Sequence, residues 1–130
     1  MTKVVILGHG GYGSAVKRNL GMLIGEQQDY FYIDFNELDD LEILRNKIQE
    51  TLAQTGENGV LFCCDLAGGS PFREAATICL SHPDYCCVAG LNIAAYTEMT
   101  FNLDMLPAEL ASMACDVAKQ SIMQFPQPEQ

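Results

Sequence analysis

The sequence has few basic residues and no long apolar run. Seven Lys and Arg stand against seventeen Asp and Glu, which gives a net charge of −10 at pH 7 in a chain of 130 residues. A field of that sign repels phosphate backbones and anionic lipid heads, so we expect no binding to nucleic acid or to membrane surfaces. The longest apolar runs are residues 4–7 and 60–64, far short of the ~20 residues of a membrane span. Because Met1 leads straight into a strand pattern rather than a signal peptide, we expect a cytoplasmic protein.

The six cysteines lack the spacing of a metal site or of a disulfide framework. No C-x-x-C occurs, and two adjacent pairs, Cys63-Cys64 and Cys86-Cys87, lie inside apolar runs. Neighbouring residues of a strand point to opposite faces of a sheet, so each pair can supply two small buried apolar side chains. We therefore expect free thiols in a reducing compartment, and neither a metal nor a cofactor.

Apolar strands and helical patterns alternate along the chain. The hydrophobic fraction of 48% is enough for a core, and the length fits one domain, predicted over residues 1–125 with a disordered tail over 126–130. The spacing predicts strands at residues 3–7, 30–34, 60–64, 85–90 and 121–125, and helices at 15–24, 41–55, 71–80, 93–101 and 107–119. Strands separated by helices indicate right-handed βαβ units. The predicted fold is α/β, a doubly wound, mostly parallel sheet in the order 2-1-3-4 with helices on both faces.

Side chains suited to capping mark the starts of two predicted helices. Asn36 or Asp39 is expected to cap the second helix, and Ser70 the third, with Pro71 at its first helical position.

A glycine-rich turn follows the first predicted strand. Gly8, Gly10 and Gly13 satisfy the pattern G-x-G-x-x-G, and Asp34 follows the next strand. This pattern is typical of dinucleotide-binding folds, and a small dinucleotide-binding module is therefore one hypothesis. Against it, the chain is short for a two-lobed dinucleotide fold, and that chemistry has no use for His9 between the glycines.

His9 and Asp65 are expected to meet across the sheet. His9 lies in the first glycine-rich turn, and Asp65 ends the third predicted strand. In the order 2-1-3-4 those strands are neighbours ~4.8 Å apart, and their carboxyl ends lie where ligands bind in such sheets. A carboxylate that accepts one ring N–H of a histidine leaves the lone pair of the other nitrogen free as a nucleophile.

An anion site is predicted beside this pair. Gly68, Gly69 and Ser70 place backbone N–H groups and a hydroxyl at a helix N-terminus, where the partial positive charge favours a phosphoryl group. We take Gly10, Gly69 and Ser70 as the phosphate-binding residues and His9 and Asp65 as the catalytic ones. The other histidine, His82, precedes Pro83 at a helix end and is expected to be a surface or capping residue.

The sequence resembles the IIA domains of the mannose class of the bacterial phosphoenolpyruvate-dependent sugar phosphotransferase system (PTS). The resemblance is carried by GHGGYG at 8–13, IDF at 33–35, GVLFCCDLAGGSPF at 59–72 and VAGLNIAAYTE at 88–98. It implies that His9 accepts a phosphoryl group from phospho-HPr and passes it to a IIB component, and through it to sugar entering by the membrane IIC and IID components. In that family's pattern Asp65 orients the histidine and Ser70 contacts the phosphate.

The resemblance also implies a homodimer. Residues 121–125 would form a C-terminal antiparallel edge strand that is exchanged between the subunits. Some family members have an aromatic residue just after the aspartate, where this chain has Leu66 and Ala67, which leaves partner and sugar choice open. A second hypothesis within the same chemistry is the IIA-like phosphotransfer subunit of a dihydroxyacetone kinase.

Overall fold

The computed structural model describes residues 1–128 and contains four strands and five helices in that range. The strands are β1 (Lys3–His9), β2 (Tyr30–Phe35), β3 (Val60–Cys64) and β4 (Tyr85–Ala89). The helices are α1 (Tyr12–Ile24), α2 (Leu41–Thr55), α3 (Ser70–Cys79), α4 (Ile93–Met99) and α5 (Pro107–Ser121). Each predicted strand and helix up to residue 120 is thus present, with bounds that differ by a few residues.

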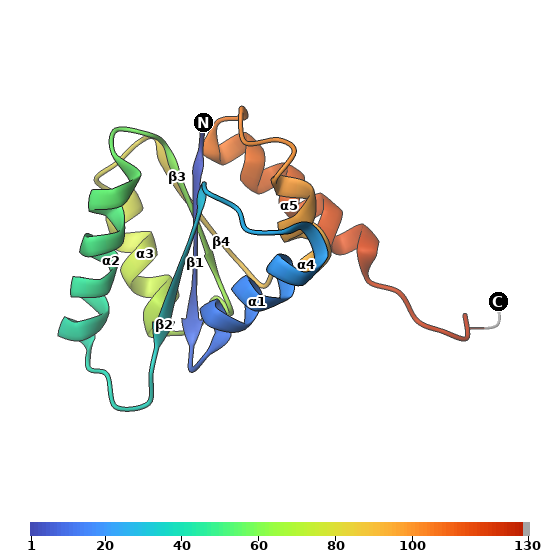
Figure 1. Ribbon diagram of the computed structural model, residues 1–130, viewed down its shortest axis with the longest axis horizontal. Helices are drawn as coiled ribbons and strands as arrows, with labels where there is room; N and C mark the ends of the chain where they lie inside the picture. Colours follow the sequence, from blue (N-terminus) through green and yellow to red (C-terminus); the bar gives the residue numbers. More distant parts are fainter. Residues whose placement is uncertain (129–130) are drawn as a thin grey trace.

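The strands form one parallel sheet between two helical layers. Their order is β2-β1-β3-β4, and each pairing is parallel, which confirms the predicted order 2-1-3-4. Helices α2 and α3 cover one face of the sheet, and α1, α4 and α5 cover the other (Figure 1). Both faces are therefore removed from water, which explains why β3 is apolar and buried at every position instead of alternating.

Alternate residues of the central strands pack into two separate hydrophobic cores, one on each face of the sheet. Val4 and Ile6 of β1 face the layer that contains α1, α4 and α5. Val5 and Leu7 point the other way and pack with residues of α2 and α3. This alternation follows from the two-residue period of a strand, and it fixes the register of β1 because a one-residue slip would exchange the two sets.

The register places the ends of β1 and β3 at the same edge. Leu7 pairs with Cys64, and the amide of Asp65 donates to the carbonyl of Leu7 at 3.2 Å. The first residue after β3 therefore lies beside Gly8, one position before His9. All parallel strands present their carboxyl ends at one edge, so the two glycine-rich turns meet there.

Two helix caps differ from the sequence-based expectation. Helix α2 is capped by Asp40, whose carboxylate accepts from the amide of Ile43 at 2.9 Å, and not by Asn36 or Asp39. Asp39 instead accepts from the amide of Asn36 at 2.9 Å and from Nζ of Lys47 at 2.7 Å, which closes the preceding turn. The cap is one residue later because this turn uses the Asp39 carboxylate.

The predicted N-cap role of Ser70 is also wrong. The N-cap of α3 is Gly69, Ser70 is the first residue of the helix, and no side chain makes a cap hydrogen bond there. The capping position requires extended backbone, and Gly69 adopts it at φ −150° and ψ 176°. The Ser70 hydroxyl is consequently not used in a cap.

The predicted strand over residues 121–125 is not formed. Ser121 is the last residue of α5, and residues 122–128 form neither helix nor strand. Figure 1 shows this segment leaving the body of the molecule beyond α5. A lone strand needs a neighbour to satisfy its N–H and C=O groups, and the single chain offers it none at that position. Of the predicted tail over 126–130, residues 129 and 130 lie outside the described residues.

Candidate functional site

His9 and Asp65 are in direct contact at the carboxyl edge of the sheet. Nδ1 of His9 lies 2.8 Å from Oδ2 of Asp65, and the same oxygen accepts from the backbone amide of His9 at 3.0 Å. The side chain of His9 is 44% exposed and that of Asp65 13% exposed. An ionised carboxylate can only accept, so Nδ1 carries the hydrogen and Nε2 keeps its lone pair.

The Asp65 carboxyl is held in its ionised form. Partial burial alone would raise its pKa, but hydrogen bonds from the amide and ring of His9, and one from the amide of Leu66, together outweigh it. The Leu66 amide donates to Oδ1 at 3.0 Å. The pKa of Asp65 therefore lies below its ordinary value of 3.8.

Two glycines are required by the close packing around this pair. A Cβ added to Gly69 would lie 2.5 Å from Cε1 of His9 and 3.0 Å from Nε2. A Cβ on Gly8 would lie 2.8 Å from Cγ of Asp65 and 2.7 Å from Cδ1 of Tyr12. Gly8 thus lets the carboxylate reach the histidine, and Gly69 lets the start of α3 approach the imidazole ring.

Gly10 has a different local role. It adopts φ +58°, in the left-handed region that favours glycine, and no atom lies within 4 Å of the place where its Cβ would stand. Its amide donates to the carbonyl of Phe35 at 2.8 Å. The backbone of Gly10 therefore turns the chain after β1 and leaves open space beside the histidine.

Asp34 and Gly13 have structural partners. Oδ1 of Asp34 accepts from the amide of Ser14 at 2.9 Å, and its Oδ2 accepts from the Ser14 hydroxyl. A Cβ on Gly13 would lie 2.9 Å from the carbonyl oxygen of Ile33. The motif that resembles a dinucleotide fingerprint is thus used to join the start of α1 closely to β2.

Helix α3 directs its N-terminus at the histidine. Gly69 is its N-cap, and Pro71 has no N–H to place there. The first-turn amides of a helix have no partner within the helix, and with the helix dipole they favour an anion. Nε2 of His9 therefore lies next to Gly69, at the positive end of this helix.

Two residues at the site were not singled out from the sequence. The ring of Phe35 meets the ring of His9 edge-on, with 5.9 Å between the centroids, and the hydroxyls of Tyr12 and Tyr96 lie 2.5 Å apart. Tyr12 stands within GHGGYG and Phe35 ends IDF. The position of Tyr12 and Phe35 inside these motifs could have drawn attention to them. The contact of Tyr12 with Tyr96, however, depends on the packing of α1 against α4.

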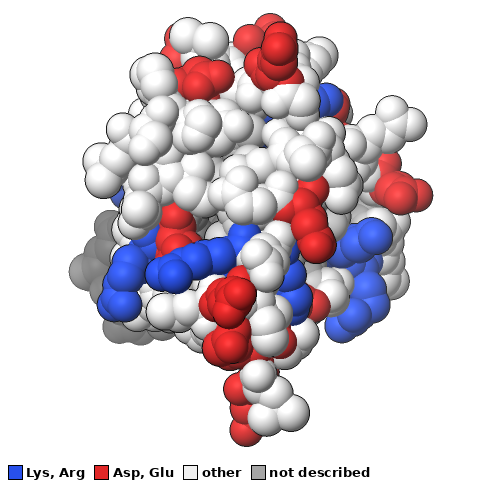
Figure 2. Space-filling model, turned by 90° about the vertical axis from the view of Figure 1, so that its left-hand side faces the viewer, with Lys and Arg blue, Asp and Glu red and all other residues white. Residues whose placement is uncertain are grey.

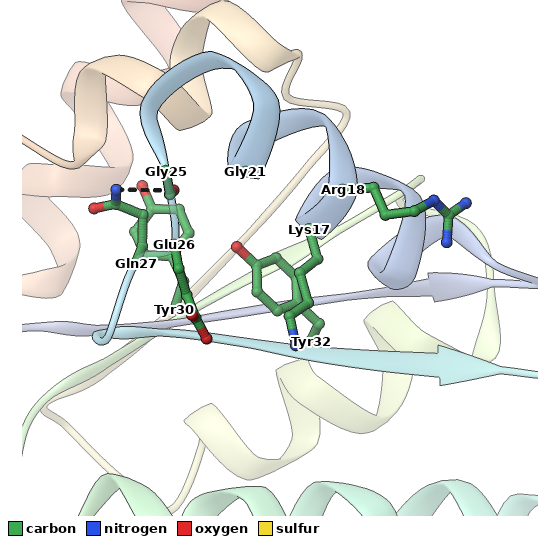
Figure 3. Close-up of a pocket in the computed structure, with 8 residues that line it drawn as sticks. All are labelled: Lys17, Arg18, Gly21, Gly25, Glu26, Gln27, Tyr30 and Tyr32. Carbon is green, nitrogen blue, oxygen red and sulfur yellow. Dashed lines mark hydrogen bonds between the residues drawn. The ribbon is translucent and has the colours of Figure 1, made fainter.

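A cavity in the described chain lies away from His9. It has a volume of about 470 Å³ and lies between α1 and β2, with Lys17, Glu26, Gln27, Tyr30 and Tyr32 among its lining residues. Figure 3 shows the Lys17 side chain beside the ring of Tyr32, with Nζ of Lys17 6.0 Å from the ring centroid. A second hollow, of about 380 Å³, adjoins Gly69. It is lined by Ala67, Gly68, Phe72, Arg73 and Leu80 among others.

Charge is unevenly distributed over the α2 and α3 face. Figure 2 shows a band of Lys and Arg side chains crossing this face, with acidic side chains above and below it. The basic residues on these two helices are Arg45, Lys47 and Arg73. Although the whole chain is acidic, this face presents both signs of charge.

Residues 1–128 contain neither a cluster of metal ligands nor a membrane-spanning helix. No group of three or more His, Cys, Asp or Glu side chains in that range is arranged to hold a metal ion. No helix in the same range has the length and apolar character needed to cross a membrane.

A family model described as "EIIA-man: PTS system fructose IIA component" matches residues 3–114. The chain is 32% identical over 126 residues to the mannose-specific EIIAB component of the PTS of Escherichia coli K12, which covers 94% of this chain and 39% of that protein. It is 30% identical over 100 residues to the fructose-specific EIIA component of Bacillus subtilis 168, which covers 76% of this chain and 68% of that one. The chain thus spans 39% of the length of the EIIAB relative.

Solved structures show the same fold. The mannose/sorbose-specific IIA subunit from Enterococcus faecalis superposes with a TM-score of 0.88 at 25% identity, covering 99% of this chain and 98% of the other. The EIIA component from Streptococcus agalactiae gives a TM-score of 0.87 at 22% identity over 96% of this chain and 98% of that one, a likeness of fold. Because the family match includes both glycine-rich turns and the His9–Asp65 pair, the chain belongs to the mannose family of PTS EIIA phosphocarriers.

Proposed function

We propose that this chain carries a phosphoryl group on Nε2 of His9 during PTS sugar uptake. The observation that carries the proposal is the bond between Nδ1 of His9 and Asp65, at 2.8 Å, which leaves the opposite ring nitrogen as a base and nucleophile. The 44% exposure of the histidine side chain gives a partner protein access to it.

The reaction is a transfer between two imidazoles. The lone pair of Nε2 attacks the phosphorus of phospho-HPr, a new N–P bond forms, and the N–P bond of the donor breaks with its electron pair staying on the donor ring. The His9 ring becomes an imidazolium as the bond forms. Asp65 stabilises that positive charge and keeps the ring in one tautomer, so it is a positioning and electrostatic group.

Gly69 and Ser70 supply the anion-binding side of the site. The ring of His9 lies so close to Gly69 that a Cβ there would stand 3.0 Å from Nε2. A phosphoryl group on Nε2 would therefore be next to the first-turn amides of α3 and within reach of the Ser70 hydroxyl. For Gly10 we propose that its missing side chain leaves room for the phosphoryl group, since its amide is bonded to Phe35.

The partners follow from the family. We propose phospho-HPr as donor and a IIB component as acceptor, which acts with membrane IIC and IID components, and we propose a cytoplasmic location. The exposed carboxylates of Glu26, Glu37, Asp40 and Glu42 and the net charge of −10 would favour a basic donor surface. The relatives are named for mannose, fructose and sorbose, and these sugars are the first to test in uptake assays.

We also propose that the chain forms a homodimer by exchange of its C-terminal segment. Ile122, Met123 and Phe125 are exposed by 76, 74 and 89%, a high exposure for apolar side chains on a tail. The strands β2 and β4 are both edges of the sheet, with backbone groups free to pair. Docking of residues 122–125 as an antiparallel strand on a partner's sheet would bury these apolar side chains and pair the backbone groups of a sheet edge.

The direct test is phosphorylation by purified general components. Phosphoenolpyruvate, enzyme I and HPr should add one phosphoryl group to the protein, stable to alkali and labile to acid, as measured by intact-mass spectrometry. His9→Ala should remove the modification, while His82→Ala, which changes the exposed histidine stacked on Tyr85, should keep it. Equal labelling of His9→Ala and the parent would overturn the proposal.

A further inference from the structure

Two free cysteines on neighbouring strands lie close together next to the site. Sγ of Cys64 is 4.0 Å from Sγ of Cys87. Cys64 is the last residue of β3 and directly precedes Asp65, and Cys87 is in the middle of β4. Both belong to the core beneath α2 and α3. No other pair of cysteine side chains among residues 1–128 is joined by a hydrogen bond.

The strand register explains the contact. Phe62 pairs with Cys87 and Cys64 pairs with Ala89, so the two cysteines are diagonal neighbours on one face of the sheet. A disulfide has an S–S length of about 2.05 Å, so the sulfurs would have to approach by about 2 Å. Strand β3 is buried at every position, whereas β4 is half-buried throughout and forms an edge. The shift would therefore fall mainly on β4.

The two thiols differ in accessibility and acidity. Cys64 is fully buried, and Cys87 is partly exposed. The hydrogen bond between them lowers the pKa of the Cys87 thiol, and that same bond together with burial raises the pKa of Cys64. Cys87 is thus the first sulfur that a dissolved oxidant would meet as a thiolate.

We propose that Cys64 and Cys87 form an oxidisable thiol pair, which a hydroperoxide converts into a disulfide, and that this disulfide slows phosphoryl transfer at His9. The rate effect rests on the proposed function, whereas the disulfide does not. This places a redox-sensitive modification site at the end of the strand that directly precedes Asp65.

The oxidation balances in two steps. The Cys87 thiol gives up its proton, and the thiolate attacks one oxygen of hydrogen peroxide. The O–O bond breaks, the departing hydroxide takes up that proton, and a sulfenic acid and the first water form. The Cys64 sulfur then attacks the sulfenic sulfur, its proton goes to the departing hydroxyl, and a second water leaves as the S–S bond forms. The two thiols lose two electrons in total, and the peroxide takes up both.

The link to the site is covalent. Asp65 follows Cys64 in the chain, its amide donates to Leu7 at 3.2 Å, and its carboxylate holds the His9 ring at 2.8 Å. The part of the shift that falls on Cys64 would draw it toward β4 and pull the adjacent Asp65 away from β1. Hydrogen bonds weaken steeply with poor geometry, so the imidazole would lose its fixed orientation.

The test measures the disulfide and the rate separately. The reduced protein is treated with hydrogen peroxide, digested without reductant, and mapped by mass spectrometry. We expect a cross-linked peptide pair joining Cys64 and Cys87, reversed by dithiothreitol. The oxidised protein should accept phosphate from phospho-HPr about tenfold more slowly, the lower range for losing one charge-assisted hydrogen bond.

Matched variants identify the pair. Cys87→Ala should form no such cross-link and should keep its rate after peroxide treatment. Cys86→Ala, one residue earlier on β4 and in the opposite core, should behave as the parent does. Absence of the Cys64–Cys87 peptide in the parent, or an oxidised parent that transfers phosphate at the full rate, overturns the proposal. If even the reduced parent accepts no phosphate, the proposed function fails, and peptide mapping still decides the disulfide.

Discussion

One oxygen of Asp65 binds His9 twice. Oδ2 accepts from the backbone amide of His9 at 3.0 Å and lies 2.8 Å from Nδ1 of its ring. The carboxylate therefore fixes the position of the residue and the orientation of its side chain together. Its second oxygen accepts from the amide of Leu66 at 3.0 Å, which anchors the carboxylate to its own loop.

Removal of this carboxylate should slow transfer without unfolding the protein. We expect Asp65→Ala to keep its circular dichroism spectrum and to accept phosphate roughly 10–150-fold more slowly, since a charge-assisted hydrogen bond is worth roughly 1.5–3 kcal/mol. Asp29→Ala, which removes a carboxylate paired with Lys3, should transfer at the parent rate. Equal quench-flow rates for Asp65→Ala and the parent would mean that Asp65 does not position the histidine.

The close approach of Gly69 to the imidazole gives a steric prediction. Gly69→Ala places a methyl group 2.5 Å from Cε1 of His9, so the ring or the start of α3 must move. A misplacement of about 1 Å can cost about 100-fold in rate. In Gly68→Ala the nearest atom is Cδ1 of Leu66 at 3.9 Å, and this variant should remain close to the parent. Similar rates for the two variants would show that the approach to the ring is not needed.

The variant Ser70→Ala tests whether Ser70 contributes to the stability of the fold or to phosphate binding. A side chain that caps a helix contributes about 0.5–2 kcal/mol, but Ser70 makes no cap hydrogen bond. We expect Ser70→Ala to have an unchanged urea midpoint while the phosphorylated form is lost faster, because the phosphoryl group loses a hydroxyl donor. A lower midpoint with unchanged phosphate loss would restore the capping role.

The Asp65 carboxyl should titrate below its ordinary pKa of 3.8. Its folded pKa is depressed, so the stabilisation that it gives is fully present above the unfolded pKa and is lost as the pH falls through the folded pKa. The carboxyl carbon resonance of Asp65, followed by NMR, reports this directly. In His9→Ala the pKa should rise, because the ring hydrogen bond and charge interaction are removed. A value in the parent above the ordinary one would contradict the observed contacts.

The C-terminal segment should govern assembly. Deletion of residues 122–130 leaves α5 complete, including the bond of 2.8 Å from Asn92 to Oγ of Ser121. We expect the full chain to be a dimer by light scattering and the truncated one a monomer of lower thermal stability, because an exchanged strand buries apolar side chains of both copies. A truncated protein that remains a dimer would exclude the exchange.

The periodicity of the sequence was sufficient to predict the four strands of the sheet and the helices between them. Continuous apolar strands separated by helical patterns predicted the order 2-1-3-4, since buried parallel strands need helices on both faces. The strand at 121–125 is absent from the single chain, where Ser121 continues the helical pattern of α5; an exchanged edge strand depends on a partner that local sequence does not specify, and it stays a prediction. The predicted capping residues were wrong, since the caps are Asp40 and Gly69, because several polar residues compete for one cap.

The sequence by itself determined which residues gather at the site. His9 and Asp65 each follow a strand, and the carboxyl ends of neighbouring parallel strands must meet. Only the tertiary structure decided which atoms touch: that one carboxylate oxygen binds both the amide and the ring of His9, and that Asp34 bonds Ser14. It also decided that Cys64 lies 4.0 Å from Cys87. Contacts of this kind depend on strand register and on the packing of helices distant in sequence, which local patterns do not encode.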